Sequence, residues 1–332
     1  MKHQNNLSQS IINSNINKIR GISTSDIDEL SHFQINKNRR YTQLHPGKLK
    51  GDYVEVNLGG VQIFREKLSA GVLIEAAPAS SFLPFATLLS NSEGFNFCGK
   101  SQQKNTLLQA TGGTWDLNFK NNIHVIAAVF SREKFSHDIE RLTGQEIPSN
   151  WLLSKASLTD HLALNHYGQG LNNIINIIQQ NPKILVKENA IRMLGDSILR
   201  LLFNALSKTT PPVEKKSSQS NRLVGVRRVI DYLHNYSDQI PTIPELCQIA
   251  NLSERTLQYG FKEYLGVTPI RYLRLVRLNG VRRELLISVP KKDRVVDVAL
   301  NWGFIELSRF AREYRQLFQE LPSETLNNIQ QV

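Results

Sequence analysis

Apolar residues in the last third of the chain recur at the spacing of an amphipathic helix. In "NLSERTLQYGFKEYLG", residues 251–266, Leu257, Phe261 and Leu265 fall at i, i+4 and i+8. Side chains spaced in this way share one face of a helix and can pack on a core. The opposite face carries most of the hydrogen-bond donors: Arg255, Gln258, Tyr259 and Lys262. The pattern therefore predicts a helix with a donor-rich outer face.

This pattern occurs twice. Leu257, Phe261, Leu265 and Pro269 are matched 53 residues later by Phe310, Tyr314, Phe318 and Pro322. Just upstream, Leu246, Cys247, Asn251 and Leu252 are matched 52 residues later by Val298, Ala299, Gly303 and Phe304. An internal repeat of this kind indicates two copies of one supersecondary unit.

The pattern of each copy predicts a helix-turn-helix unit. A short helix ends at Asn251 or Gly303, residues that tolerate left-handed backbone geometry, and a second helix follows. Ser253 is placed to cap the second helix of the first unit. Any helical bundle contains helix, turn and helix, so one copy alone would not distinguish a DNA-binding unit from ordinary packing. Two copies in common register favour DNA binding.

A third helix is predicted between the units. "TPIRYLRLVRLNGVRRELL", residues 268–286, opens with Thr268 as cap and Pro269 at the first helical position, where a missing N–H costs least. It would hold two recognition helices about 34 Å apart, the spacing of successive major grooves. Gly260 lies inside the first recognition helix and costs about 1 kcal/mol relative to alanine. Either a close approach of this helix to the DNA backbone or a relaxed helix would explain a glycine at this position.

The N-terminal part has a different pattern, with short apolar runs between turn residues from Asp52 to Phe130. "DYVEVNLGGVQIFRE" predicts two alternating strands joined at Gly59 and Gly60. From about Ser131 to Leu206 the period lengthens toward that of helices. The strand pattern fits a small antiparallel barrel or sandwich, and we expect the barrel. The predicted fold is thus an α+β chain of two domains: a small antiparallel, cupin-like β-barrel with packed helices, then an all-α domain with two helix-turn-helix units joined by a linker helix.

The expected organisation has four parts. They are a loose N-terminal arm over 1–40, a sensor domain over 41–206, a polar linker over 207–221 and a DNA-binding domain over 222–332. The length of 332 residues also suits two cores better than one small core.

Charge supports a polyanionic partner. The formal net charge is +11 and the pI is near 9.6. From Asn221 onward, 13 Arg and 3 Lys face 12 acidic residues, so the excess there is only +4. Most of those cations are arginines, which suit bidentate contacts to phosphates and guanine edges.

Signals for other functions are weak. Cys98 and Cys247 match no disulfide or zinc spacing, and a solitary His124 is more typical of a satisfied strand residue than of a metal ligand. We expect no catalytic residues and no metal. Phe97 and Trp115 are expected in the core, with an apolar ligand pocket as the alternative. No signal peptide or membrane span is evident, which predicts a soluble cytoplasmic protein.

These motifs carry a family resemblance. Residues 221–330 resemble the two-unit DNA-binding domain of AraC/XylS-type transcription regulators, whose second unit typically has a Gly-Phe pair, here Gly303 and Phe304. The resemblance implies that the first recognition helix reads bases through Arg255, Gln258 and Tyr259. The corresponding outward positions of the second recognition helix are Leu307, Ser308, Ala311 and Arg312. Of these, Ser308 and Arg312 are expected to reach bases, so the second unit should contribute less specificity.

Phosphate contacts are assigned to basic residues on and around these helices. The candidates are Arg271, Arg274, Arg277, Lys262 and Arg315, together with Arg282 and Arg283 of the linker helix. The sequence departs from the family at "FQELPSE", where Gln319 and Leu321 replace the usual glycine and threonine before the proline. The second recognition helix must therefore be capped differently.

The N-terminal part is similar to one branch of that family. "QLHPGKLKGDYVEVNLGGVQIFRE" at 43–66, "GGTW" at 112–115 and "LGDSIL" at 194–199 are similar to regulators of ethanolamine-utilisation operons. The resemblance implies an activator that responds to ethanolamine with adenosylcobalamin. It leaves the effector-binding residues unknown.

Two hypotheses follow. The first is a transcription activator that binds double-stranded promoter DNA, with RNA polymerase and a small-molecule effector as partners and with dimerisation open. The second is a cupin-like binding protein or enzyme whose helical C-terminus mediates oligomerisation. The repeat favours the first hypothesis, because an oligomerisation tail has no need for two helix-turn-helix units with outward Arg and Gln side chains.

Overall fold

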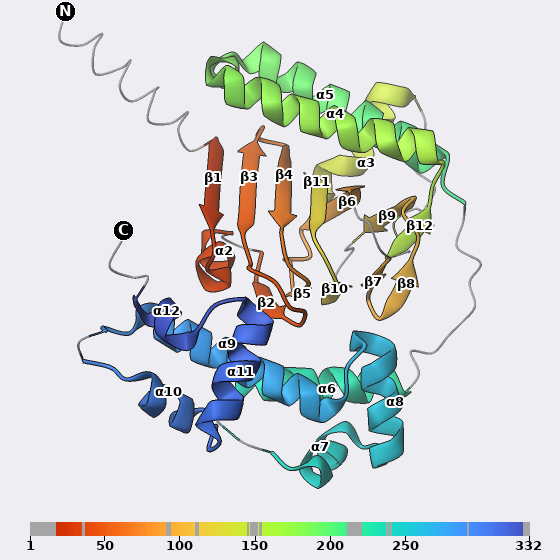
Figure 1. Cartoon of the computed structure of the whole chain (residues 1–332). Helices are drawn as coiled ribbons and strands as arrows, with labels where there is room; N and C mark the ends of the chain where they lie inside the picture. The colour runs from red at the N-terminus through yellow and green to blue at the C-terminus, as the bar shows by residue number, and fades with distance from the viewer. Residues whose placement is uncertain are drawn as a thin grey trace, which may run out of the picture.

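The N-terminal part is β-rich and the C-terminal part is helical in the computed structural model (Figure 1). The structure describes residues 18–34, 37–90, 94–109, 113–144, 146, 152, 155–210, 221–236, 239, 241–290 and 292–327. Most of the expected linker, residues 211–220, lies outside the described residues, as does part of the "GGTW" motif. Two strands begin before residue 41, where the sequence predicted a loose arm with only a little helix.

Seven antiparallel strands form the larger sheet, in the order β1-β3-β4-β11-β6-β9-β12. Their bounds are β1 Ile19–Thr24, β3 Gly51–Asn57, β4 Val61–Leu68, β6 Phe82–Ser90, β9 Thr106–Gln109, β11 Ile123–Ser131 and β12 Ala156–Leu158. The predicted hairpin is confirmed, because β3 pairs with β4 from Gly51 opposite Leu68 to Asn57 opposite Gln62. Gly59 turns the chain with φ +85°, a conformation that suits glycine.

Five strands form the smaller sheet, in the order β2-β5-β10-β7-β8. Their bounds are β2 Arg39–Gln43, β5 Val72–Ala76, β7 Phe95–Phe97, β8 Lys100–Gln102 and β10 Trp115–Phe119. The predicted closed barrel is wrong, since the strands form two separate sheets whose end strands leave edges. Inward and outward side chains alternate in a barrel and in a two-sheet sandwich alike, so the sequence pattern did not separate them.

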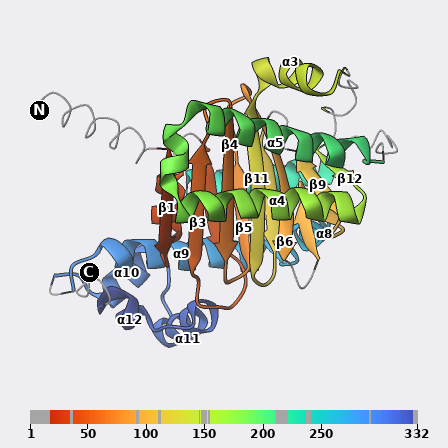
Figure 2. The same ribbon diagram turned by 90° about the horizontal axis from the view of Figure 1, so that it is seen from above.

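Alternation along β11 shows how the layers are built. Val125, Ala127 and Val129 face the space between the two sheets, whereas Ile126 and Ala128 face the helices on the other side. Those helices are α3 Arg132–Thr143, α4 His161–Gln180 and α5 Glu188–Ser207, with the 3-10 helix η2 Pro182–Val186 between the last two. Figure 2 shows α4 and α5 lying across the larger sheet.

The remaining helices, apart from the short α2 Ile27–Phe33 beside β1, build the C-terminal domain. They are α6 Asn221–Asn235, α7 Ile243–Ala250, α8 Glu254–Leu265, α9 Pro269–Ile287, α10 Val295–Asn301, α11 Leu307–Phe318 and α12 Pro322–Asn327. They share one apolar core, which Leu44 and Leu73 of the smaller-sheet side also join. In Figure 1 this domain lies below the sheets, on the side opposite α3, α4 and α5. No described helix has both the length and the apolar composition of a membrane span.

Candidate nucleic-acid interface

The first helix-turn-helix unit consists of α7 and α8. Helix α7 begins with a capping box in which Thr242 and Glu245 satisfy each other's backbone N–H groups. It ends at Asn251, which has the left-handed conformation expected from the sequence (φ +52°). Ser253 then caps α8, its Oγ accepting a hydrogen bond from the N–H of Thr256 at 3.3 Å. Local capping thus fixes the turn between the two helices.

The outer face of α8 carries the predicted base-reading residues on one exposed surface. Leu257, Phe261 and Leu265 are buried, and Arg255, Gln258, Tyr259 and Lys262 are exposed. The Arg255 guanidinium lies over the Tyr259 ring, 5.7 Å from its centroid, and Gln258 Nε2 donates to Glu254 Oε1 at 3.0 Å. An exposed, donor-rich face of this kind is what a recognition helix presents to the major groove.

The second unit consists of α10 and α11 and repeats this construction with different capping. Gly303 has φ +75°, and Phe304 behind it is buried against Phe310. At the far end, Gln319 takes the left-handed conformation (φ +58°), and its N–H donates to Arg315 O. The helix end therefore adopts the geometry usually given to glycine, with a glutamine in its place.

The outer face of α11 is less rich in free donors. Ser308, Arg312 and Arg315 are exposed, as predicted, whereas Leu307 and Ala311 are half-buried. Sequence reasoning missed Ile305, which is 86% exposed in the turn just before α11. A large exposed aliphatic side chain beside a recognition helix can contact a thymine methyl group.

The predicted phosphate-binding arginines of α9 are in different environments. Arg274 is ion-paired with Glu313 of α11, and Arg282 pairs with Glu320 at 3.0 Å. Arg271 is half-buried. Arg277 has two buried nitrogens, Nε and Nη2, without a hydrogen-bond partner among the described residues. Arg274 and Arg282 thus hold the second unit to the linker helix, whereas two of the three guanidinium nitrogens of Arg277 are buried and unpaired within the described part of the chain.

Gly260 has a structural explanation that differs from both sequence interpretations. A Cβ at this position would lie 2.7 Å from Val226 Cγ2 and 2.8 Å from Arg222 Cγ. The glycine therefore lets α8 pack closely on α6, and it faces the domain core instead of the outer surface. Close helix packing outweighs the propensity cost here.

Comparison with known proteins supports this architecture. A family model described as a helix-turn-helix domain matches residues 246–328. The probable thc operon regulatory protein of Rhodococcus erythropolis is 38% identical over 104 residues, covering 31% of either chain. The XylDLEGF operon transcriptional activator 2 of Pseudomonas putida is 35% identical over 143 residues, which cover 43% of this chain and 86% of that protein. The chain belongs to the AraC/XylS family of transcription regulators.

The chain spans only 31% to 41% of the length of several curated AraC/XylS relatives that it matches. A solved structure of a probable AraC family transcriptional regulator from Rhodopseudomonas palustris is 32% identical and covers 32% of this chain and 96% of that chain, with a TM-score of 0.30.

One recognition helix of this AraC/XylS chain also contacts the N-terminal domain, which sequence reasoning missed. Tyr264 of α8 donates its Oη hydrogen to Asp116 Oδ2 of β10, and Arg227 of α6 donates to the same oxygen at 3.0 Å. Arg227 Nε also donates to Tyr264 Oη at 3.1 Å. Burial raises the pKa of Asp116, while Tyr264 and Arg227 oppose that rise. We call these three residues the domain clamp.

The linker helix makes a second buried contact with the sensor side. The side-chain amide of Asn279 accepts from Gln43 N and donates to Gln43 O, each at 3.0 Å. The Gln43 side chain in turn donates to Leu317 O at 3.1 Å. An asparagine among the apolar residues of α9 was the only sequence signal for this contact. Such a signal gives no indication of its partner 236 residues away.

Proposed function

We propose that this chain is a sequence-specific DNA-binding transcription activator whose N-terminal domain responds to a small-molecule effector. The observation that carries the proposal is the pair of helix-turn-helix units, each with an exposed polar face on its second helix. Helix α9 joins them, and its 19 residues span about 28 Å at 1.5 Å per residue. That length is close to the roughly 34 Å between successive major grooves.

The two units have unequal roles in this proposal. Helix α8 reads bases through Arg255, Gln258 and Tyr259, because arginine and glutamine match guanine and adenine edges in the major groove. Helix α11 offers Ser308 and Arg312 to bases. The operator should therefore be asymmetric, with the stronger sequence requirement in the half bound by α8.

Phosphate contacts would supply orientation and a salt-dependent part of the affinity. Lys262 and Arg315 are exposed beside the two reading faces, and Arg271 and Arg277 lie on the helix between them. Arg274 is assigned a weaker phosphate role than the other four, because its guanidinium already pairs with Glu313.

The effector and the other partners belong to the proposal as well. RNA polymerase is the expected partner of an activator, and dimerisation is left open. The local resemblance to regulators of ethanolamine utilisation nominates ethanolamine with adenosylcobalamin as candidate effectors. Both compounds are therefore included among the ligands whose binding is measured.

The test is a titration of the full-length chain with its own upstream DNA and with random DNA of equal length, at several salt concentrations. We expect tighter binding to one upstream site, a falling affinity with salt, and footprints in two major-groove segments about one helical turn apart. Equal affinity for every sequence, or a footprint in only one segment, would contradict the proposal.

A further inference from the structure

A cavity of about 280 Å³ lies between the two sheets of the N-terminal domain. Its wall is mostly apolar and includes Phe64, Phe97, Trp115 and Val129. The charged side chains that line it are Lys37 and Arg39, and no acidic residue is among its described lining. Its volume is just below the usual range of ligand pockets, about 300–1,000 Å³, so it suits a small ligand.

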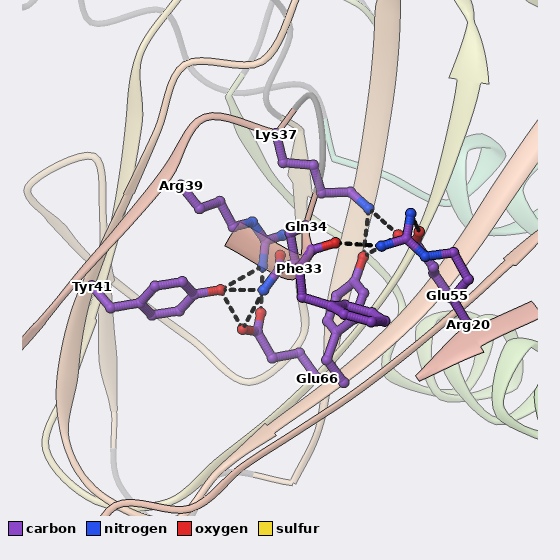
Figure 3. Close-up of polar contacts among 9 residues, drawn as sticks. Arg20, Phe33, Gln34, Lys37, Arg39, Tyr41, Glu55 and Glu66 are labelled. Atoms are coloured by element: carbon purple, nitrogen blue, oxygen red, sulfur yellow. Dashed lines mark hydrogen bonds and ion pairs between the residues drawn. The ribbon is translucent and has the colours of Figure 1, made fainter. Parts of the chain in front are cut away.

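Arg39 is buried beside this cavity with part of its hydrogen-bonding capacity unused. Its Nη1 pairs with Glu66 and contacts Tyr41 Oη at 3.3 Å (Figure 3). Its Nε is buried and has no hydrogen-bond partner among the described residues. The guanidinium lies 4.9 Å from the Phe64 centroid and 5.5 Å from that of Trp115, both of which line the cavity.

An unsatisfied buried donor destabilises a fold, and more so when it is charged. The Nε–H shares one edge of the planar guanidinium with Nη2, and this edge is the two-donor fork that matches a carboxylate. In Arg39 the Glu66 pair uses the other terminal nitrogen. The Nε–H on this edge is thus a buried donor, unpaired in the part of the chain that the structure describes, and a carboxylate is the acceptor that best matches it.

The charges around Arg39 favour an anion. Three cations, Arg20, Lys37 and Arg39, are joined to two carboxylates, Glu55 and Glu66 (Figure 3). The cluster therefore has one positive charge in excess. Burial lowers the pKa of Lys37 to about 8, which still leaves it largely protonated at neutral pH.

We propose that this cavity binds a small monocarboxylate with an apolar body, its carboxylate on the free edge of Arg39 and near Lys37, and its body against Phe64, Trp115 and Val129. The inference rests on the proposed effector response of this domain and names its ligand class. A phosphate suits the cavity less well, because the wall around the two cations is largely apolar.

The effectors suggested by the sequence resemblance fit this cavity poorly. Ethanolamine is a cation at neutral pH and would face Lys37 and Arg39 with no acidic side chain among the described lining. The corrinoid ring system of adenosylcobalamin is too large for a cavity of this volume. A cobalamin would have to bind elsewhere on the chain.

The test measures ligand binding to the full-length protein without DNA, by calorimetry and thermal shift. The probes are benzoate and octanoate, with benzyl alcohol, octanol, ethanolamine, adenosylcobalamin and inorganic phosphate as comparisons. We expect either carboxylate to raise the melting temperature in proportion to the logarithm of its concentration, and its matched alcohol to bind at least about tenfold more weakly. Stabilisation by the alcohols equal to that by the carboxylates, or by ethanolamine or phosphate alone, would overturn the proposal.

Two variants locate the site. Arg39→Gln should weaken carboxylate binding by about 10- to 100-fold, whereas Arg40→Gln, on the opposite face of β2, should leave it unchanged. Arg39→Gln leaves Glu66 without its ion-pair partner and could disturb the fold. Ala86→Leu is therefore a second variant, which blocks the cavity with a larger side chain and leaves the charge cluster intact. Binding that survives both Arg39→Gln and Ala86→Leu would overturn the assignment. DNA binding plays no part in these measurements, so failure here is distinct from failure of the proposed DNA-binding function.

Discussion

Trp115 and Asp116 are consecutive residues of β10 whose side chains lie on opposite faces of the smaller sheet. Trp115 lines the cavity, and Asp116 is bound by Tyr264 and Arg227 of the DNA-binding domain. Arg39 and Arg40 repeat the arrangement on β2, since Arg40 pairs with Glu75 at 2.9 Å and approaches Asp231 of α6 at 3.6 Å. The cavity and the DNA-binding domain therefore lie on opposite faces of the smaller sheet, with only that one layer between them.

The domain clamp should contribute measurably to stability. Asp116→Asn removes the charge that Arg227 and Tyr264 share in a buried site, and we expect the free energy of unfolding to fall by about 1–3 kcal/mol. Asp231→Asn is the matched control, because Asp231 is largely exposed and its ion pair should be worth less than about 1 kcal/mol. Urea unfolding of the two variants measures the difference. Equal, small losses would mean that the clamp does not hold the domains together.

A glycine pair tests the same interface sterically. Gly99 and Gly113 both have positive φ angles, +72° and +77°, so alanine carries similar backbone strain at either position. A Cβ at Gly99 would lie 2.4 Å from the Tyr264 ring, whereas one at Gly113 would meet nothing within 4 Å. Gly99→Ala should therefore destabilise the protein by about 1–3 kcal/mol more than Gly113→Ala, as measured by urea unfolding. If Gly99→Ala and Gly113→Ala were equally destabilised, Tyr264 would not lie against the turn at Gly99 in solution.

Carboxylate binding should weaken as pH rises through about 8. Burial lowers the pKa of Lys37 in the folded protein from 10.5 to about 8, and the nearby Arg39 contributes to the lowering. The carboxylates of Glu55 and Glu66 oppose it. Without ligand, the unfolded chain holds more protons between pH 8 and 10.5, so the Lys37 contribution to stability increases over that range. A bound carboxylate needs the protonated ammonium, so its affinity should fall about 3- to 10-fold from pH 7 to pH 9.

Calorimetry across that pH range checks this prediction, with Lys37→Met as the control. The variant should bind carboxylate more weakly at pH 7 and show little change up to pH 9. A pH dependence that persists unchanged in Lys37→Met would show that a group other than the Lys37 ammonium causes it.

The sequence was most informative where the structure depends on local patterns. The spacing of Leu257, Phe261 and Leu265, the left-handed turn at Asn251 and the cap at Ser253 each depend on residues within one or two helical turns, and the structure has all of them. The exposure of Arg255 follows from the same periodicity.

Local patterns did not predict contacts between residues that are far apart in the sequence. Asp116 meets Tyr264 across 148 residues of sequence, and nothing near either residue indicates its partner. Alternation predicted the strands but did not distinguish a barrel from a sandwich. For Trp115 the sequence favoured the core over a ligand pocket, whereas the side chain lines the cavity. Gly260 illustrates the same limit, because its reason lies in α6, in the side chains of Val226 and Arg222.

The central claim is that α8 reads DNA sequence, and Arg255→Ala tests it most directly. Binding of the full-length variant to the cognate site and to random DNA is compared with wild type by anisotropy titration, with Lys262→Ala as the control on the same face. Arg255→Ala should lose about 1–3 kcal/mol on cognate DNA and relax the preference at about one base, with a smaller loss on random DNA. Lys262→Ala should weaken both similarly and reduce the salt slope by about one. An equal loss on cognate and random DNA for Arg255→Ala would contradict the account.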